Sequence, residues 1–204
     1  MSDIITTIDA LEAIYGPVVP AATIKVLDHV SEHYGQFIKA APFVVLSTSG
    51  PEGLDCSPRG DPKGFVRIHD SRTLMIPDRR GNNRVDTLRN IVRDPRIALL
   101  FMIPGIGETM RVNGTAVLST DLSLRESFAM EDKVPACVIV ITVKEIYTQC
   151  QKALARSKLW DAATQIPRSA LPTVGSMLQA ISKGDFDGKA YDDAYPERMK
   201  RTIY

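Results

Sequence analysis

The turn Pro77-Asp78-Arg79-Arg80-Gly81-Asn82-Asn83-Arg84 lies at the centre of the stretch from Leu54 to Phe101 and joins two different patterns. Before it, residues 73–76 form a short apolar run of strand type. After it, apolar residues recur at helical spacing until Pro95. The pattern predicts a strand, a basic loop and a helix over residues 85–92. Gly81 permits a sharp turn, and we expect Asn82 or Asn83 to cap the helix.

Three arginines, Arg79, Arg80 and Arg84, gather where this helix is expected to begin. The first turn of a helix presents free N–H groups and the positive end of the helix dipole, both of which favour an anion. Cations at the same place indicate a doubly charged group such as a phosphate. The alternative is a solvated basic loop beside Asp78 and Asp86.

The composition is that of an ordinary globular protein. The chain has 204 residues, of which 44% are hydrophobic and 24% charged, so it is long enough for one substantial core. A net charge of +1 argues against nucleic-acid binding through a broad positive field, and one Trp and six Phe provide no aromatic platform. We therefore expect any anion site to be local, and no nucleic-acid partner.

Neither the cysteines nor the histidines indicate a metal site. Cys56, Cys137 and Cys150 are odd in number, widely spaced and without a C-x-x-C pair, so they indicate neither a disulfide framework nor a zinc site and fit a reducing cytoplasm. His29 and His33 stand one helical turn apart, but no acidic third ligand has a suitable spacing. The N-terminus has no basic region, and no apolar run approaches the roughly 18 residues of a membrane span. We expect a cytoplasmic protein with no membrane partner.

Strand-type patterns dominate the middle of the chain. Few of them are separated by helices, so a mostly antiparallel sheet is predicted rather than a βαβ stack. Strands of this length and regularity favour closure into a barrel, which removes unpaired edges. The predicted fold class is mainly β (α+β), with a six- to seven-stranded antiparallel barrel and flanking helices. The runs are 43–48, 54–57, 65–69, 73–76, 96–102, 109–118 and 136–143, with alternation continuing over 146–150.

The two ends of the chain differ from this middle part. Two helical patches, one over Ile8 to Tyr15 and one over Ile24 to Ile38, predict two helices that pack on the barrel. Three prolines and little core material follow residue 160, as expected for a surface-wrapping tail or a partner-clasping arm. We predict one structural domain with an N-terminal segment (1–41), a barrel (42–160) and a C-terminal arm (161–204).

Four blocks of sequence, in this order, resemble the pyridoxamine 5′-phosphate oxidase-like FMN-binding proteins. The resemblance is to a large bacterial branch rather than to the authentic oxidases, and it extends from about Leu11 to Tyr204. It implies a split β-barrel that forms a homodimer, with two FMN molecules in clefts between the subunits. The blocks are Asp55-Cys56-Ser57-Pro58-Arg59-Gly60-Asp61, Ile76 to Arg84, Gly107-Glu108-Thr109-Met110-Arg111-Val112-Asn113-Gly114, and Lys152 to Asp161.

The resemblance also implies cofactor contacts. In this family one strand end lines the flavin, the next strand end lies along it, and the basic loop holds its phosphate. The residues at these positions are, in that order, Asp55, Cys56, Ser57 and Arg59; Ile76 and Pro77; and Asn83 and Arg84.

Two later groups complete the implied site. Glu108 and Thr109 fall near the place where the oxidases present a Gln to the isoalloxazine ring, and Arg111 follows on the same expected strand. A late helix is implied to reach the cofactor from the second subunit, and its alternative is a cationic surface helix with a buried Trp. Its residues are Lys152, Arg156, Ser157 and Trp160.

Departures from the family pattern bear on activity. The authentic oxidases hold pyridoxamine phosphate with an Arg and a His close to the C-terminus, whereas the last histidine here is His69. We therefore expect no pyridoxamine 5′-phosphate oxidation. Gln149 replaces the usual His of this branch, and no residue is nominated as general acid or base. The predicted function is an FMN-dependent oxidoreductase that acts on an unidentified small molecule, with an electron donor such as NAD(P)H. The alternative is a non-catalytic protein that stores or senses flavin, haem or a deazaflavin.

Overall fold

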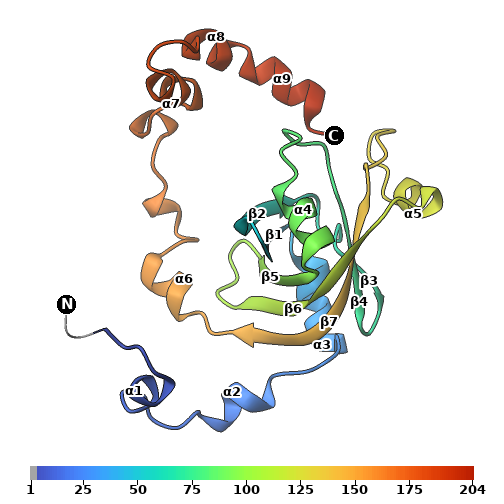
Figure 1. The fold of residues 1–204 in the computed structure, drawn as a ribbon, viewed down its shortest axis with the longest axis vertical. Coiled ribbons are helices and arrows are strands. Elements are labelled where there is room, and N and C mark those ends of the chain that lie inside the picture. The colour runs from blue at the N-terminus through green and yellow to red at the C-terminus, as the bar shows by residue number, and fades with distance from the viewer. Residues whose placement is uncertain (1–3) are drawn as a thin grey trace.

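A computed structural model describes residues 4–204 as a seven-stranded sheet with short helices around it and a long arm after the last strand (Figure 1). Residues 1–3 of the predicted N-terminal segment lie outside the described residues. Within residues 4–204, the helices are all too short or too polar to traverse a lipid bilayer. The elements are α1 (Ile8–Glu12), α2 (Pro20–Ile24), α3 (Glu32–Ala40), β1 (Phe43–Gly50), β2 (Gly53–Gly60), β3 (Arg67–Asp70), β4 (Thr73–Pro77), α4 (Asp86–Arg93), β5 (Arg96–Met102), β6 (Thr109–Ser119), α5 (Leu122–Ser127), β7 (Val138–Gln149), α6 (Lys152–Ser157), the 3₁₀ turns η1 (Ala162–Thr164) and η2 (Arg168–Ala170), α7 (Val174–Ile181), α8 (Gly188–Asp193) and α9 (Tyr195–Thr202).

The sheet has the strand order β2-β1-β5-β6-β7-β4-β3, and every neighbouring pair is antiparallel. The two longest strands, β6 and β7, form its centre and pair from Thr109 with Gln149 to Ser119 with Val138. A register shift after Asn113 places Gly114 so close to β7 that a Cβ there would lie 2.1 Å from the Thr142 carbonyl oxygen. The predicted split-barrel class, with an antiparallel sheet and flanking helices, is confirmed.

The core is built from every second residue of the strands. In β1 and β5, for example, Val44, Leu46, Leu99 and Phe101 are at most 1% exposed, as the side-chain period of two requires. Helix α3 covers part of the sheet, and its Ile38 is fully buried. The largest fully buried side chains are Phe101, Ile38, Leu46, Leu74, Ile76, Leu99, Met110, Ile139, Ile141, Ile146, Val44 and Val66.

The N-terminal helices differ from the expectation. The second expected helix is wrong over residues 25–31, where the backbone of Leu27 instead pairs with Ile146 of β7 through N–O distances of 3.0 and 2.8 Å. Ser31 then caps the shorter helix α3. Helices α1 and α2 bury no side chain. The division of the chain into three segments stays a prediction.

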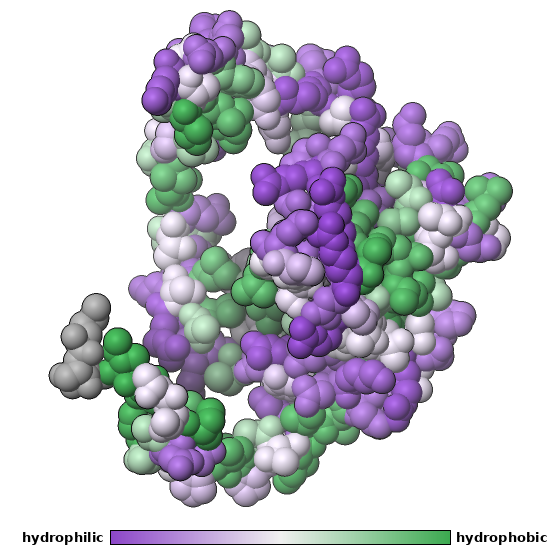
Figure 2. All heavy atoms as spheres, in the orientation of Figure 1, coloured by the Kyte–Doolittle hydropathy of each residue, from purple (hydrophilic) through white to green (hydrophobic). Residues whose placement is uncertain are grey.

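The arm leaves the end of β7, runs away from the barrel and returns to it (Figure 1). Its helices α7, α8 and α9 pack mainly on one another. Near the start of the arm, the Trp160 indole donates to the Ile106 carbonyl at 2.8 Å, and at its far end the Tyr204 hydroxyl donates to Asp61 at 2.9 Å. Between these contacts, Figure 2 shows an open gap that separates the arm from the barrel.

Candidate functional site

A cavity of about 960 Å³ lies where the end of β2, the β4–α4 loop, the start of α4 and the α5–β7 connection meet. Its volume is within the range of small-molecule sites. The basic loop that the sequence singled out forms much of its wall. The lining residues are Ser57, Pro58, Arg59, Asp78, Arg79, Arg80, Gly81, Asn82, Asn83, Arg84, Val85, Asp86, Thr87, Leu88, Arg125, Asp132, Lys133, Val134, Pro135, Ala136 and Tyr204.

The loop begins directly at the sheet. Strand β4 ends at Pro77, and the Asp78 N–H donates to the Cys137 carbonyl at 2.9 Å, so the loop departs beside the start of β7. Burial, and next the Asp78 carboxylate, raise the pKa of the Cys137 thiol to about 11. Cys137 therefore stays a protonated thiol with no nucleophilic role near neutral pH.

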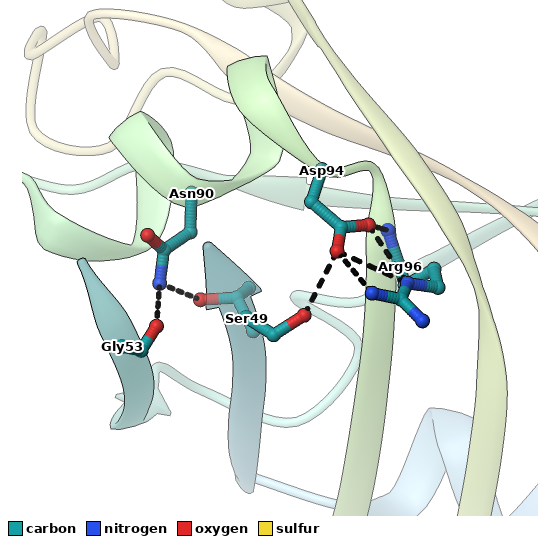
Figure 3. A network of polar contacts seen from close by, with 6 residues as sticks. Ser49, Gly53, Asn90, Asp94 and Arg96 are labelled. Carbon is teal, nitrogen blue, oxygen red and sulfur yellow. Dashed lines mark hydrogen bonds and ion pairs between the residues drawn. The ribbon is translucent and has the colours of Figure 1, made fainter. Parts of the chain in front are cut away.

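Helix α4 is anchored on β1 and β2 through one buried amide (Figure 3). The Asn90 side-chain nitrogen donates to the Thr48 hydroxyl at 3.2 Å and to the Gly53 carbonyl at 3.4 Å. The helix approaches so closely that a Cβ at Gly50 would lie 2.3 Å from the Asn90 side-chain oxygen. This anchor fixes the direction in which the start of α4 points.

A second polar contact holds the other end of α4 (Figure 3). The Asp94 carboxylate accepts hydrogen bonds from the Arg96 guanidinium at 2.9 Å and from the Ser49 hydroxyl at 3.0 Å. Arg96, and to a lesser degree Ser49, hold the pKa of Asp94 well below its usual range.

The predicted cap of α4 is wrong. The N-cap residue is Val85, in the left-handed conformation with φ 54°, and no side chain caps the helix. The Asn82 side-chain oxygen instead accepts a hydrogen bond from the Arg84 N–H at 3.0 Å, which closes a turn inside the loop. This oxygen is therefore already used before the helix begins. A β-branched residue in this conformation costs on the order of 1–3 kcal/mol. The first-turn N–H groups of α4 are left without a side-chain acceptor, as an anion site requires.

Two arginines of the cavity wall are structural. Arg59 pairs with Asp78 at 2.8 Å, and Arg79 pairs with Asp61 at 2.7 Å. None of these four side chains is more than 19% exposed. The pairs tie the end of β2 to the basic loop, and removing one partner would leave a buried charge uncompensated.

The remaining cations of the wall form no buried ion pair within residues 4–204. Arg84 is 79% exposed and pairs only with the nearby Asp86. Arg80 is exposed and forms no ion pair within residues 4–204. Arg125 and Lys133 face the same cavity from the α5–β7 side. Cations therefore outnumber carboxylates around the cavity, and those nearest the start of α4 are the least committed.

The predicted residues of β2 and β4 divide into two sets. Ser57 and Arg59 line the cavity together with Asn83 and Arg84 of the loop. Asp55 and Cys56 do not line it. The Asp55 carboxylate accepts from the Ser57 hydroxyl at 3.0 Å and from the Thr87 hydroxyl, and so positions α4. Cys56 is exposed, Ile76 is fully buried, and Pro77 borders an adjoining cavity of about 410 Å³.

The predicted site residues of β6 and of the α6 region lie outside the cavity within a single copy of the chain. None of Glu108, Thr109 and Arg111 lines the cavity. Arg111 donates to the Tyr147 hydroxyl at 3.3 Å, and Thr109 is buried at the start of β6. Lys152, Arg156, Ser157 and Trp160 belong to the exposed region of α6 and the turn after it, again outside this cavity.

Sequence reasoning missed several members of the cavity wall, among them Arg125, Lys133 and Tyr204. Arg125 is in a short helix and Lys133 forms an isolated antiparallel bridge with Met130, and neither stands in a block that carried the resemblance. Tyr204 is 143 positions from its partner Asp61. No local pattern in the sequence signals such a contact.

The chain is thus a split antiparallel barrel with a basic cavity beside an uncapped helix start. The sequence profile of the family described as pyridoxamine 5′-phosphate oxidase matches residues 30–150. The chain therefore belongs to the pyridoxamine 5′-phosphate oxidase family. The curated proteins contain no match to this sequence.

Solved structures with a similar fold come from several bacteria. HupZ of Group A Streptococcus is 19% identical, with a TM-score of 0.49, and the match covers 59% of this chain and 94% of HupZ. General stress protein 26 of Bacillus anthracis is 18% identical, with a TM-score of 0.44 and coverages of 56% and 88%. A FAD-binding protein of Mesorhizobium loti is 14% identical, with a TM-score of 0.43 and coverages of 60% and 96%.

Proposed function

We propose that this chain binds FMN and that the first turn of α4, with Arg80 and Arg84, holds the phosphate. The observation that carries the proposal is the uncapped start of α4 beside two exposed arginines in the cavity wall, Arg80 with no ion pair within residues 4–204 and Arg84 with only the exposed pair to Asp86. A phosphate ester carries about two negative charges near neutral pH. Arginine and helix N–H donors bind such a group through charge-assisted hydrogen bonds.

The cavity also suits the rest of the ligand. An isoalloxazine ring needs an apolar slot with a few polar groups, and Leu88, Val134, Pro135 and Tyr204 provide apolar surface in the wall. Its volume of about 960 Å³ is enough for a ligand of this size. The residues present therefore fit FMN.

The activity that we infer is that of a flavin-dependent oxidoreductase acting on a small molecule, with NAD(P)H as a suitable electron donor. Bound flavin supplies the electron-transfer chemistry. The side chains of this protein bind the phosphate, orient the ring and shield it from water. Arg59 and Arg79, each paired with a carboxylate, keep the wall of the site in shape.

The working form that we propose is a homodimer with FMN at the subunit interface. Residues 108–111 and the α6 region lie outside the cavity of their own copy, so a second copy is needed to bring them to the flavin as the resemblance implies. The surface also supports this assembly. Most of the large apolar side chains that the structure exposes belong to the N-terminal segment before β1 or to the arm, and apolar side chains border the gap in Figure 2.

A second candidate is a binding protein without turnover, for flavin, haem or a deazaflavin. One observation favours it: within residues 4–204, the wall of the cavity holds no histidine, and its deeper carboxylate, Asp78, is paired with Arg59. Such a wall offers a substrate no imidazole, the side chain that most often transfers protons near neutral pH.

The absorption spectrum of the purified protein, before and after addition of FMN, tests the proposal. We expect flavin bands that stay with the protein on gel filtration, and weaker retention of riboflavin, which has no phosphate. A colourless protein that takes up no FMN would refute flavin binding. Anaerobic mixing with NADH or NADPH then separates the two candidates, because bleaching indicates an oxidoreductase and a persistent yellow colour indicates a binder. We expect no oxidation of pyridoxamine 5′-phosphate.

A further inference from the structure

Tyr204 at the end of the arm is bound to the barrel by two distinct contacts. Its hydroxyl donates to the Asp61 carboxylate at 2.9 Å, and its ring centroid lies 5.5 Å from the Arg79 guanidinium carbon. Asp61 is only 3% exposed and also binds Arg79. Tyr204 is thus the third member of a network whose other two members belong to the β2–β3 connection and the basic loop. A hydrogen bond to a buried carboxylate is stronger than one between neutral groups.

The rest of the arm contributes little to this placement. Helices α7, α8 and α9 pack mainly on one another, and Figures 1 and 2 show the arm crossing open space before it returns. A segment with so few contacts to the barrel depends on the contacts at its end for a fixed position. The contacts of Tyr204 therefore decide where the end of the arm lies.

Tyr204 also stands between two cavities. It lines both the 960 Å³ cavity and the adjoining 410 Å³ cavity, and Arg79 and Arg80 do the same. The smaller cavity is walled by the segment from Pro58 to Asp61, by Phe65 and by Ile203 of the arm. Arg59 is the one residue of the segment from Pro58 to Asp61 to which the resemblance gave a role. The structure shows that it receives the end of the arm.

We propose that Tyr204 is a binding residue of the candidate site, where its ring forms a movable wall that retains the ligand. This inference rests on the proposed function and extends it to the C-terminal arm. When Tyr204 is docked on Asp61 and Arg79, its side chain closes the boundary between the two cavities. When it leaves, the two cavities join, and the ligand in the larger one loses an aromatic wall. Ligand release is then coupled to undocking of the arm.

The dissociation rate of FMN from the full-length protein tests this role. Tyr204→Ala removes both the ring and the hydroxyl, and we expect FMN to dissociate about tenfold faster, the effect of losing one aromatic contact of this kind. Tyr204→Phe keeps the ring over Arg79 and removes only the hydroxyl, so a smaller acceleration is expected. Tyr195→Ala is the matched control, because Tyr195 is an exposed tyrosine of the same arm that lines neither cavity.

Limited proteolysis of the arm gives a readout that does not depend on activity. Cleavage within residues 161–203 should be faster in Tyr204→Ala than in Tyr195→Ala, and FMN should slow it in the wild-type protein. If wild-type protein binds FMN but both Tyr204 variants release it at the wild-type rate, the inference is overturned and the proposed function stands. If wild-type protein binds no FMN, the proposed function fails and this inference fails with it.

Discussion

Asn90 of α4 and Thr48 of β1 form a buried hydrogen bond of 3.2 Å that connects the helix of the candidate anion site to the barrel. Asn90 is 6% exposed and Thr48 is 4% exposed, so the bond is shielded from water. Since α4 carries the proposed phosphate site at its start, the position of that site depends on this contact at its middle.

Asn90→Ala should lower the free energy of unfolding by about 1–3 kcal/mol, because it leaves the Thr48 hydroxyl buried without its partner. Urea denaturation measures the change. Asn113→Ala is the control, since its side chain bonds Glu145 in an exposed pair and a loss within about 1 kcal/mol is expected. Equal losses in the two variants would contradict the anchoring role of Asn90.

Arg84→Ala should weaken FMN binding by about tenfold or more, the value of one charge-assisted hydrogen bond, and leave the unfolding midpoint unchanged. Fluorescence titration with FMN measures the affinity. Arg93→Ala tests the same residue type at the other end of α4, where Arg93 pairs with Glu52 outside the cavity, and should bind FMN as the wild type does. An unchanged affinity in Arg84→Ala would remove the proposed phosphate site.

The three thiols should differ in reactivity. Burial, with the nearby Asp78 carboxylate, raises the pKa of Cys137 to about 11, whereas Cys56 and Cys150 are exposed. A thiol reagent at about pH 8 should therefore modify Cys56 and Cys150 and reach Cys137 only after denaturation. Mass spectrometry of the labelled peptides identifies the sites, and rapid labelling of Cys137 in the folded protein would disprove the expectation.

Acid should remove the contribution of Asp94. Hydrogen bonds from Arg96 hold the pKa of Asp94 in the folded protein below its ordinary value of 3.8. The stability that this carboxylate provides is therefore present above pH 3.8 and is lost as the pH falls toward the folded pKa. The difference in free energy of unfolding between the wild type and Asp94→Asn should be constant near neutral pH and shrink below pH 3.8. A difference that persists unchanged in acid would contradict the assignment.

The exposed apolar stripe of α7 should matter for assembly. Val174, Met177 and Ile181 recur at helical spacing and are 45%, 44% and 79% exposed. If a second copy covers them, Ile181→Asp should shift the protein from dimer toward monomer in light-scattering measurements. Ala180→Asp places the same charge beside this stripe and should leave the mass unchanged. A wild-type protein that is monomeric at all concentrations would exclude the homodimer.

The strands were predictable because their signal is local. Alternation of buried side chains, such as Val44 and Leu46 in β1 or Leu99 and Phe101 in β5, is written directly into neighbouring positions. The basic loop was found for the same reason, since a strand, a glycine and a helix follow one another within one short stretch.

The errors arose where distant contacts decide the structure. Residues 25–31 have helical spacing, but Leu27 pairs with Ile146, which is far away in the sequence. The cap of α4 was wrong because the Asn82 acceptor is used inside the loop. Which arginines remain available could not be known either, since the pairs of Arg59 and Arg79 with carboxylates form only when β2 and the loop meet.

The few attachments of the arm have a thermodynamic consequence. Within residues 4–204, the hydrogen bonds of Trp160 and Tyr204 attach the arm to the barrel near its two ends, so the arm can open without disturbing the barrel. Its amide protons should therefore exchange with solvent long before those of β6 and β7. Calorimetry of the monomeric chain should then show two separate unfolding transitions, one for the arm and one for the barrel, rather than a single cooperative one.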